Sequence, residues 1–299
     1  MGKIAFVFSG QGDQFPGMGQ DLYEKYPSAR RVFDLCDNLR PGTSSQCFTG
    51  GQEELQETKN TQPCLFAMEL AVANVLLEKG ITPDCVAGFS LGEVTAATVG
   101  GVFSWETGFQ LVCKRGELMQ REAEKWDTFM AAVVKLSTTQ VQTICDRYAG
   151  VYPVNFNCPG QIAVSGLAAQ AGDFLADVKA AGGRAILLKV KGAFHSPFMN
   201  GAAKAFAQVL KKVELKKGDV TLYSNLTAAP YTKEAADLLS EQICNAVQWE
   251  KLICNMITDG VDTFLEIGPG RTLTNMIRRI DGSVKAMPAV DYIAGVEKC

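Results

Sequence analysis

The sequence is poor in the residues and patterns that several classes of protein require. It has one histidine in 299 residues and no cysteine pair spaced as C-x-x-C, so we expect no metal site. Its net charge of −3 disfavours nonspecific binding to nucleic acid. No apolar run approaches the roughly 20 residues that a membrane span needs, and the apolar start, Ile4 to Phe8, is too short for a signal peptide. We therefore predict a soluble globular protein with neither a nucleic-acid nor a membrane partner.

The cysteines do not indicate a secreted, disulfide-bonded protein. There are ten of them, and several lie in apolar segments, where free thiols behave as small hydrophobic side chains. Thiols of this kind stay reduced in a cytosol, so the sequence favours a cytoplasmic location.

Apolar segments typical of strands alternate with segments typical of helices over most of the chain. Strands are predicted at 3–8, 85–90, 220–225 and 263–270, and helices at 28–39, 63–80, 91–101, 104–125 and 272–280. Gly80 is predicted to cap one helix at its C-terminus and Ser104 another at its N-terminus. This alternation predicts an α/β fold with a mostly parallel sheet.

The middle of the chain follows a different order. Strands are predicted at 129–136, 151–156, 161–166 and 184–190, with helices at 137–150 and around Phe174, Leu175 and Val178. The order β-α-β-β-α-β is that of a ferredoxin-like unit. We therefore expect a small subdomain at 127–191 inserted into a discontinuous large domain at 1–126 and 192–299.

Gly88-Phe89-Ser90-Leu91-Gly92 matches G-x-S-x-G, the pattern of a nucleophile elbow. A sharp turn from strand to helix exposes the serine hydroxyl there, and the flanking glycines remove β-carbons that would collide. A predicted strand precedes Ser90 and a predicted helix follows it. Ser90 is therefore a candidate nucleophile, and Leu91 a candidate donor of its backbone N–H to an oxyanion; the alternative is a structural glycine turn with an idle serine.

A serine nucleophile needs a base, and His195 is the only histidine. A lone histidine in an apolar setting is more often structural. With Ser90 as nucleophile, however, an imidazole is the side chain best suited to accept its proton near neutral pH. The 105 residues between them are no obstacle, because catalytic groups assemble in space.

Arg115 lies on the apolar stripe of the predicted helix 104–125, among Leu111, Val112, Leu118 and Met119. A buried guanidinium is costly without a partner, so it requires a carboxylate. That carboxylate belongs either to the protein, as an internal salt bridge, or to a substrate. A side chain that reaches out to solvent is the third alternative.

The turn from Ser9 to Gln14 is not a nucleotide-binding loop. It has Phe15 where the third glycine of G-x-G-x-x-G belongs, and the sequence has no Gly-Lys-Ser/Thr. A strand that ends in such a turn can still place a backbone N–H beside a reacting carbonyl.

Taken together, these segments resemble the malonyl-CoA:acyl carrier protein transacylases of fatty acid synthesis and the related acyltransferase domains of polyketide synthases. The resemblance covers essentially the whole chain, in the family's order, through FVFSGQGDQFPGMG, TQPCLFAMELA, GFSLGE, RGELMQ, NCPGQIAVSG, GAFHSPFM, YSNLTA, EQICNAVQW and EIGPGRTL. It implies a hydrolase-like α/β domain with an inserted ferredoxin-like subdomain. The implied reaction moves a malonyl group from malonyl-CoA to the phosphopantetheine thiol of acyl carrier protein, without a cofactor. We expect the chain to act as a monomer.

The resemblance also implies roles for individual residues. Ser90 would be acylated and His195 would be its base. The backbone N–H groups of Gln11 and Leu91 would form the oxyanion hole, and Arg115 would hold the malonyl carboxylate. The main-chain carbonyl of Gln242 would orient the histidine. The remaining implied residues line the substrate site: Gln62, Asn155, Gln161 and Phe194. At the position of Phe194 the sequence is similar to the malonyl-selective members of the family.

One position departs from the family pattern, because Phe89 stands where GHSxG has a histidine. Three other functions stay open at this point: an acyltransferase that serves a polyketide assembly line, a serine thioesterase or esterase, and a non-catalytic scaffold. Arg115 argues against a hydrolase of neutral esters, and the presence of both Ser90 and His195 argues against a scaffold.

Overall fold

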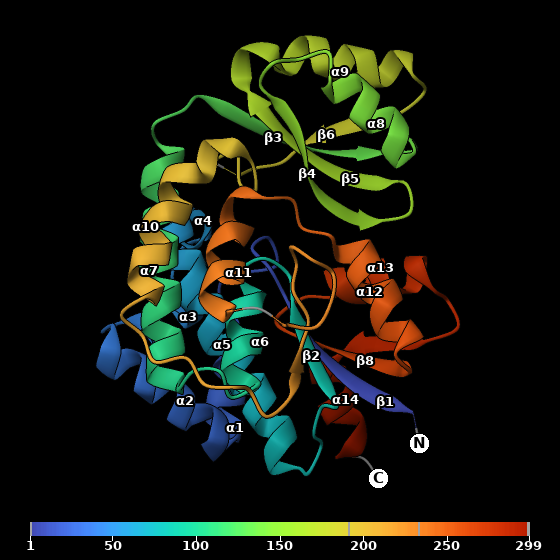
Figure 1. The fold of residues 1–299 in the computed structure, drawn as a ribbon. Coiled ribbons are helices and arrows are strands. Elements are labelled where there is room, and N and C mark those ends of the chain that lie inside the picture. The colour runs from blue at the N-terminus through green and yellow to red at the C-terminus, as the bar shows by residue number, and fades with distance from the viewer. Residues whose placement is uncertain (1, 191, 233, 298–299) are drawn as a thin grey trace.

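The computed structural model describes residues 2–190, 192–232 and 234–297, which contain two sheets (Figure 1). Sheet A has the order β7-β2-β1-β8-β9, and all its neighbouring strands run parallel. Its strands are β1 (Lys3–Phe8), β2 (Cys85–Gly88), β7 (Thr221–Leu222), β8 (Val261–Ile267) and β9 (Lys285–Pro288). Sheet B is antiparallel with the order β4-β5-β3-β6, formed by β3 (Thr128–Val134), β4 (Val151–Cys158), β5 (Gln161–Leu167) and β6 (Arg184–Leu187).

Fourteen α-helices are found in the described part of the chain. The first seven are α1 (Gln20–Lys25), α2 (Pro27–Leu39), α3 (Thr43–Thr49), α4 (Gln52–Gln56), α5 (Thr58–Glu78), α6 (Gly92–Val99) and α7 (Trp105–Ala123). The others are α8 (Thr138–Cys145), α9 (Ala171–Ala180), α10 (Asn200–Leu210), α11 (Ala235–Glu241), α12 (Trp249–Thr258), α13 (Thr272–Ile280) and α14 (Ala289–Val296). Both predicted caps are confirmed: Ser104 accepts a hydrogen bond from the N–H of Thr107, and Gly80 has φ 76° after α5.

Sheet A lies between two layers of helices, as alternate side chains of β1 show. Phe6 and Phe8 point into a core that includes α2, α5 and α7, whereas Ala5 and Val7 point into a second core with α12 and α13. A parallel strand that is buried on both faces reads as a continuous apolar run, which is why the segment KIAFVF is recognisable in the sequence.

Sheet B has the strand order of a ferredoxin-like unit, and the predicted sequence of elements β-α-β-β-α-β is confirmed. Its outer face packs against α8 and α9, through Phe174 and Val178 among others. Its inner face contributes Met130, Val154 and Ala163 to the core of the large domain. The domain boundaries at 126/127 and 191/192 stay a prediction, and residue 191 lies outside the described residues.

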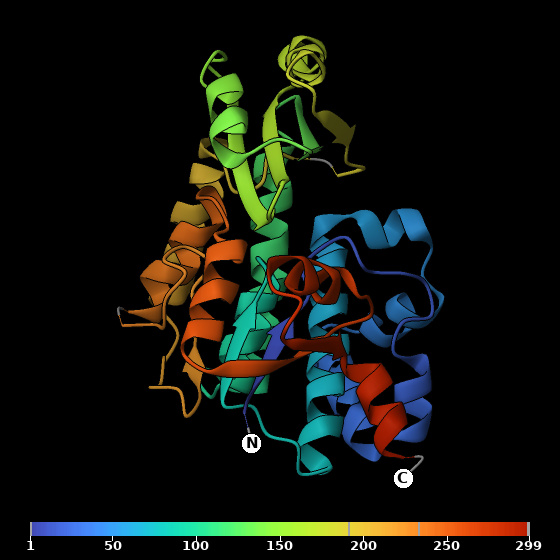
Figure 2. The same cartoon turned by 90° about the vertical axis from the view of Figure 1, so that its right-hand side faces the viewer.

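The two views show sheet B and its helices at one end of the molecule, and both chain ends at the other (Figures 1 and 2). The chain enters the small subdomain directly from α7 and returns through the segment that contains His195 into α10 (Figure 1). Residues of α7 and of this return segment therefore lie where the two subdomains meet.

Several predicted elements have different bounds in the structure, and for two of them the contacts show why. The strand predicted at 220–225 is in sheet A only at Thr221–Leu222, because Tyr223 then pairs with Pro230 in a separate bridge. The helix predicted at 63–80 begins five residues earlier, at Thr58, and includes Pro63. The carbonyl of Glu57 accepts the N–H groups of Asn60 and Thr61, so the first turn forms before the proline is reached.

No helix in the described residues is long and apolar enough to cross a bilayer. In the same part of the chain no group of three or more potential metal ligands comes together. Nine cysteines are free thiols and most are buried, while Cys299 lies outside the described residues.

Candidate active site

Ser90 lies on a sharp turn between β2 and α6. Its φ is 54°, a left-handed value that a non-glycine residue adopts only where the surrounding structure holds it there. The flanking glycines make the turn possible. A β-carbon on Gly88 would collide with the backbone of Gly92, and one on Gly92 would collide with the carbonyl oxygens of Phe8 and Ser9. The structure therefore has the geometry that the G-x-S-x-G pattern predicts.

Gly92→Ala is expected to destabilise the protein by more than about 2 kcal/mol, because the new methyl group meets immovable backbone. Gly172→Ala in α9 is the matched control: nothing lies within 4 Å of its β-carbon position, so alanine there should be neutral or stabilise by up to about 1 kcal/mol. Urea unfolding curves of the two variants measure both effects. Equal stability of the two variants would contradict the tight elbow.

His195 faces Ser90 directly. Its Nε2 lies 2.7 Å from Ser90 Oγ, and its Nδ1 lies 2.8 Å from the main-chain carbonyl oxygen of Gln242. A carbonyl can only accept, so Nδ1 carries the proton and Nε2 is left to accept the proton of the serine hydroxyl. This is the arrangement of a nucleophile, a base and a group that orients the base. In this site a main-chain carbonyl takes the place that a carboxylate has in many serine hydrolases.

The imidazole of His195 is 5% exposed. Burial, together with the positive charge of Arg115, lowers the pKa of His195 to about 4, although the hydrogen bond to Gln242 opposes the shift. The side chain is therefore neutral near pH 7 and able to act as a base.

Because the sequence has one histidine, a proton NMR titration of the untagged protein follows His195 alone. We expect its midpoint near pH 4, well below the ordinary 6.5. The neutral form is present above this pKa, so the rate of acylation should hold from neutral pH to about 5 and fall as the pH drops through 4. A midpoint at or above 6.5 would contradict the buried, cation-flanked site.

Arg115 lies on α7 with its side chain 1% exposed. Its Nη2 donates to the Oε1 of Gln242 at 2.7 Å and to Ser90 Oγ at 3.2 Å, while Nε and Nη1 have no partner. Burial lowers the pKa of the guanidinium to about 10, partly opposed by Glu93, so it stays cationic near neutral pH. Among the described residues no carboxylate forms a salt bridge with Arg115. Its side chain does not reach solvent either. A buried cation with free donors thus lies beside the nucleophile.

A cavity of about 90 Å³ brings most of the predicted residues together between the two subdomains. It is lined by Gln11, Gln62, Phe89, Ser90, Leu91, Arg115, Met119, Met130, Asn155, Leu188, Val190, Phe194 and His195. Two amide oxygens on its wall, Oε1 of Gln62 and Oδ1 of Asn155, are buried without a hydrogen-bond partner. A native interior rarely leaves polar atoms in this state, so these oxygens are suited to receive donors from a ligand.

The backbone N–H groups of Gln11 and Leu91 both belong to residues of this cavity. Among the described residues neither N–H has a protein acceptor. Gln11 follows the carboxyl end of β1 and Leu91 follows Ser90, so two neighbouring parallel strands bring them to the same edge of sheet A. Free N–H groups at this point are suited to bind an oxyanion.

Gln161 is not among the residues that line this cavity, and its predicted place in the substrate site stays a prediction. It begins β5, opposite Cys158 and Val134, and its Oε1 accepts a hydrogen bond from Arg279 at 2.9 Å. The position is set by the tight turn between β4 and β5, which carries Gln161 to the end of the hairpin. The family motif places the residue nearby in sequence, and only the strand register shows where its side chain goes.

Two polar residues of the site were not predicted. The Oδ1 of Asn225 accepts the N–H of Ser90 at 2.7 Å, and its Nδ2 donates to the carbonyl of Gly88 at 2.5 Å. Glu93 is fully buried and accepts hydrogen bonds from Asn225, Tyr231 and Gln242. Burial raises the pKa of Glu93 to about 7, although these hydrogen bonds and Arg115 oppose the shift. Asn225 ends the segment VTLYSN, which lies next to β2. A polar residue at the carboxyl end of a predicted strand could have indicated that Asn225 belongs to the site.

Phe89, the residue that departs from the family pattern, packs against Trp249 with its ring centroid 5.4 Å from the indole in an edge-on arrangement. The Nε1 of Trp249 is buried without a partner. An apolar contact therefore occupies the place where the family pattern has an imidazole.

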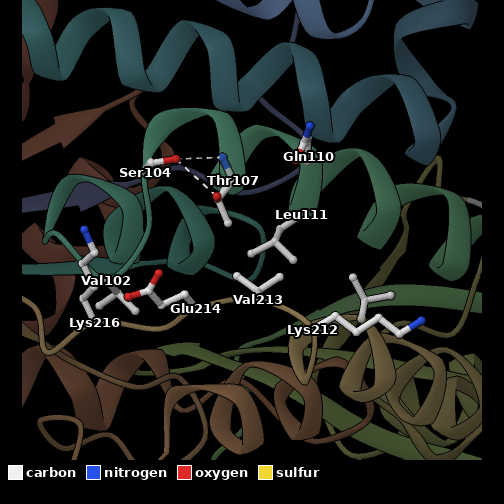
Figure 3. A pocket seen from close by; sticks show the side chains of 10 residues that line it. Val102, Ser104, Thr107, Gln110, Leu111, Lys212, Val213, Glu214 and Lys216 are labelled. Carbon is white, nitrogen blue, oxygen red and sulfur yellow. Dashed lines mark hydrogen bonds between the residues drawn. The ribbon is translucent and has the colours of Figure 1, made fainter.

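A larger cavity of about 430 Å³ lies elsewhere, along the first turns of α7 (Figure 3). Ser104 and Thr107 lie on its wall and are hydrogen-bonded to each other (Figure 3). Lys212, Glu214 and Lys216 come from the segment after α10. This larger cavity is lined by neither a nucleophile paired with a base nor a buried cation with free donors. The smaller cavity is therefore the candidate active site.

A family model described as the acyl transferase domain matches residues 5–296. The chain belongs to this family of acyl transferases. Among the relatives of this acyl transferase, the malonyl CoA-acyl carrier protein transacylase of Bacillus subtilis (strain 168) is 39% identical over 300 residues, which cover 97% of this chain and 94% of the relative. The family resemblance drawn from the sequence is confirmed.

Solved structures agree with this assignment of the acyl transferase. The malonyl-CoA:acyl carrier protein transacylase of Xanthomonas oryzae pv. oryzae matches with a TM-score of 0.95 and 33% identity, over 100% of this chain and 98% of that one. A malonyl-transacylase solved in complex with the holo acyl-carrier protein of a type II PKS matches with a TM-score of 0.93 and 32% identity, over 99% and 100%. The predicted two-part α/β fold is thus confirmed.

Proposed function

We propose that this enzyme transfers the malonyl group of malonyl-CoA to the phosphopantetheine thiol of an acyl carrier protein, through an ester on Ser90. The observation that carries the proposal is the guanidinium of Arg115, which is buried beside Ser90 Oγ and still has unpaired donors. Only an anionic acyl group makes use of such a cation. Malonyl carries a free carboxylate at the end of a short chain, and the cavity is small.

In the first half-reaction the hydroxyl proton of Ser90 passes to Nε2 of His195 while Oγ attacks the thioester carbonyl of malonyl-CoA. The N–H groups of Gln11 and Leu91 bind the oxyanion that forms. The carbon–sulfur bond then breaks, and the CoA sulfur leaves with the proton held by His195. The products are the malonyl ester of Ser90 and free CoA.

The second half-reaction runs the same steps with a different thiol. The phosphopantetheine thiol gives its proton to His195 and attacks the ester carbonyl, and Ser90 leaves and recovers the proton. The kinetics are therefore of the ping-pong type. Every proton and every bond is accounted for by Ser90, His195 and the two thiols, so the proposed reaction requires no metal or redox cofactor.

The two other classes of function are less well supported. A hydrolase for neutral esters gains nothing from Arg115, whose desolvation is costly. A scaffold gains nothing from the 2.7 Å contact between Ser90 and His195, nor from the left-handed φ of both residues. An acyltransferase of a polyketide assembly line would use the same chemistry with a different carrier.

The carrier protein is proposed as the partner on the support of the relative that was solved together with its holo acyl-carrier protein. A monomeric state, a cytoplasmic location and the lack of nucleic-acid and membrane partners stay predictions.

Phe194 is proposed to limit the size of the acyl group. It lines the cavity next to His195 in sequence and is 7% exposed. Phe194→Ser removes the ring and should admit methylmalonyl-CoA, raising its kcat/KM relative to malonyl-CoA. Competition between the two CoA thioesters measures the change. An unchanged ratio would mean that other residues set the size limit.

The proposed function is tested by separating the half-reactions. The enzyme is incubated with malonyl-CoA, freed of CoA by gel filtration, and mixed with an acyl carrier protein in either its holo or its apo form. We expect the holo protein alone to gain one malonyl group, with loss of the same group from the enzyme. Release of free malonate at the same rate with and without holo carrier would show a hydrolase instead.

A further inference from the structure

Glu93 is a carboxylate whose hydrogen bonds reach both halves of the catalytic site. It lies in the first turn of α6, three residues after the nucleophile, and is fully buried. Its Oε1 accepts the N–H of Asn225 at 3.1 Å and the hydroxyl of Tyr231 at 2.5 Å. Its Oε2 accepts Nε2 of Gln242 at 2.6 Å.

Two of these partners, Asn225 and Gln242, are themselves hydrogen-bonded to residues that react. On one side, Asn225 accepts the N–H of Ser90 and donates to the carbonyl of Gly88, so it holds the elbow in its left-handed turn. On the other side, Gln242 presents its main-chain carbonyl to His195 and its Oε1 to Arg115. The contact to Tyr231 leads to neither reacting group.

The amide of Gln242 has its orientation fixed by its partners. Its Nε2 faces two acceptors, the carbonyl of Ser90 and the carboxylate of Glu93, and its Oε1 faces the donor on Arg115. Both N–H groups of this amide therefore have an acceptor only when residue 93 presents one to Nε2.

We propose that Glu93 is a positioning residue for acyl transfer, which through Asn225 fixes the turn of the nucleophile and through Gln242 fixes the carbonyl that orients the base. This role rests on the proposed function of Ser90 and His195. Glu93 itself touches neither the substrate nor the reacting atoms.

Glutamine at position 93 has almost the same shape and cannot accept on every side. If its oxygen faces Gln242, its NH₂ meets the N–H of Asn225; if its oxygen faces Asn225, its NH₂ meets the NH₂ of Gln242. In either orientation one of the two connections opposes a donor with a donor. A buried unmatched donor is costly, so the neighbouring residue shifts.

The test compares Glu93→Gln with two matched controls. Glu69→Gln changes another fully buried carboxylate, which binds the hydroxyls of Ser9 and Thr95 and connects to neither Asn225 nor Gln242. Tyr231→Phe removes one hydrogen bond from Glu93 and leaves both connections in place. Glu93→Asp is the second variant at the site, because it keeps the charge but is one methylene shorter.

The first measurement is the single-turnover rate of acylation by malonyl-CoA, per folded enzyme. We expect Glu93→Gln to lose at least about tenfold, Glu93→Asp to lose less, and both controls to stay within about threefold of the wild type. A loss in Glu69→Gln equal to that in Glu93→Gln would overturn the proposal, because burial alone would then account for it.

The second measurement uses no substrate. A long-range ¹H–¹⁵N spectrum of the single imidazole reports its tautomer, which should be the Nδ1–H form in the wild type and in both controls. In Glu93→Gln we expect a mixture of tautomers or a shift of the Nδ1 signal. An unchanged signal together with an unchanged acylation rate would overturn the role of Glu93. A wild type that is not acylated at all would refute the proposed function instead.

Discussion

Arg115→Ala is expected to lose malonyl transfer while it keeps or gains acetyl transfer. Malonyl differs from acetyl by one carboxylate, and a charge-assisted hydrogen bond to a desolvated guanidinium contributes about 1.5–3 kcal/mol. The kcat/KM ratio of malonyl-CoA to acetyl-CoA should therefore fall by roughly tenfold to a hundredfold. The wild-type cation also disfavours acetyl, because a neutral acyl group leaves three of its five donors without a partner.

Arg115→Lys is the control for charge alone. An ammonium keeps the positive charge and lacks the planar arrangement of donors that reaches Gln242 and a carboxylate at once, so we expect only partial recovery. The comparison needs kcat/KM for both thioesters in each variant. If Arg115→Ala left the malonyl-to-acetyl ratio unchanged, the arginine would be structural.

Ser90→Ala should abolish the acyl-enzyme, and His195→Ala should slow its formation by about three orders of magnitude or more. The two side chains act as a unit across a 2.7 Å contact, so the second substitution removes little that the first has left. The double variant should therefore transfer malonyl about as slowly as Ser90→Ala alone. Stopped-flow or quenched assays of all three variants measure this.

Ser196→Ala serves as the control for the same segment. Its hydroxyl donates to the carbonyl of Ala193 at 2.5 Å and makes no contact with Ser90. Multiplicative losses in the double variant, instead of a plateau, would mean that His195 serves a purpose other than accepting the proton of Ser90.

The sequence was informative about the site where local geometry demands particular residues. Gly88 and Gly92 are required by the close approach of the backbone around Ser90, so the motif and the turn predict each other. Arg115 was recognisable because a charge on an apolar helix stripe conflicts with burial. The alternation of strands and helices likewise predicted both sheets, since it follows from buried strands and amphipathic helices.

Other parts of the site depend on contacts that periodicity does not encode. Asn225 and Glu93 are 132 residues apart and meet only because β7 pairs with β2. Gln161 was assigned to the cavity from its motif, but the register of a short hairpin turns it toward Arg279. Side-chain direction in a strand changes with each residue, so nearness in sequence was not sufficient there.

The most direct test of the account is the site of acylation. The enzyme is mixed with malonyl-CoA, quenched in acid, digested and analysed by mass spectrometry. We predict one malonyl group per chain, on the peptide that contains Ser90, with none on Ser90→Ala and with removal of the group by holo acyl carrier protein. A malonyl group on another residue, or none on a folded wild-type protein, would contradict the account.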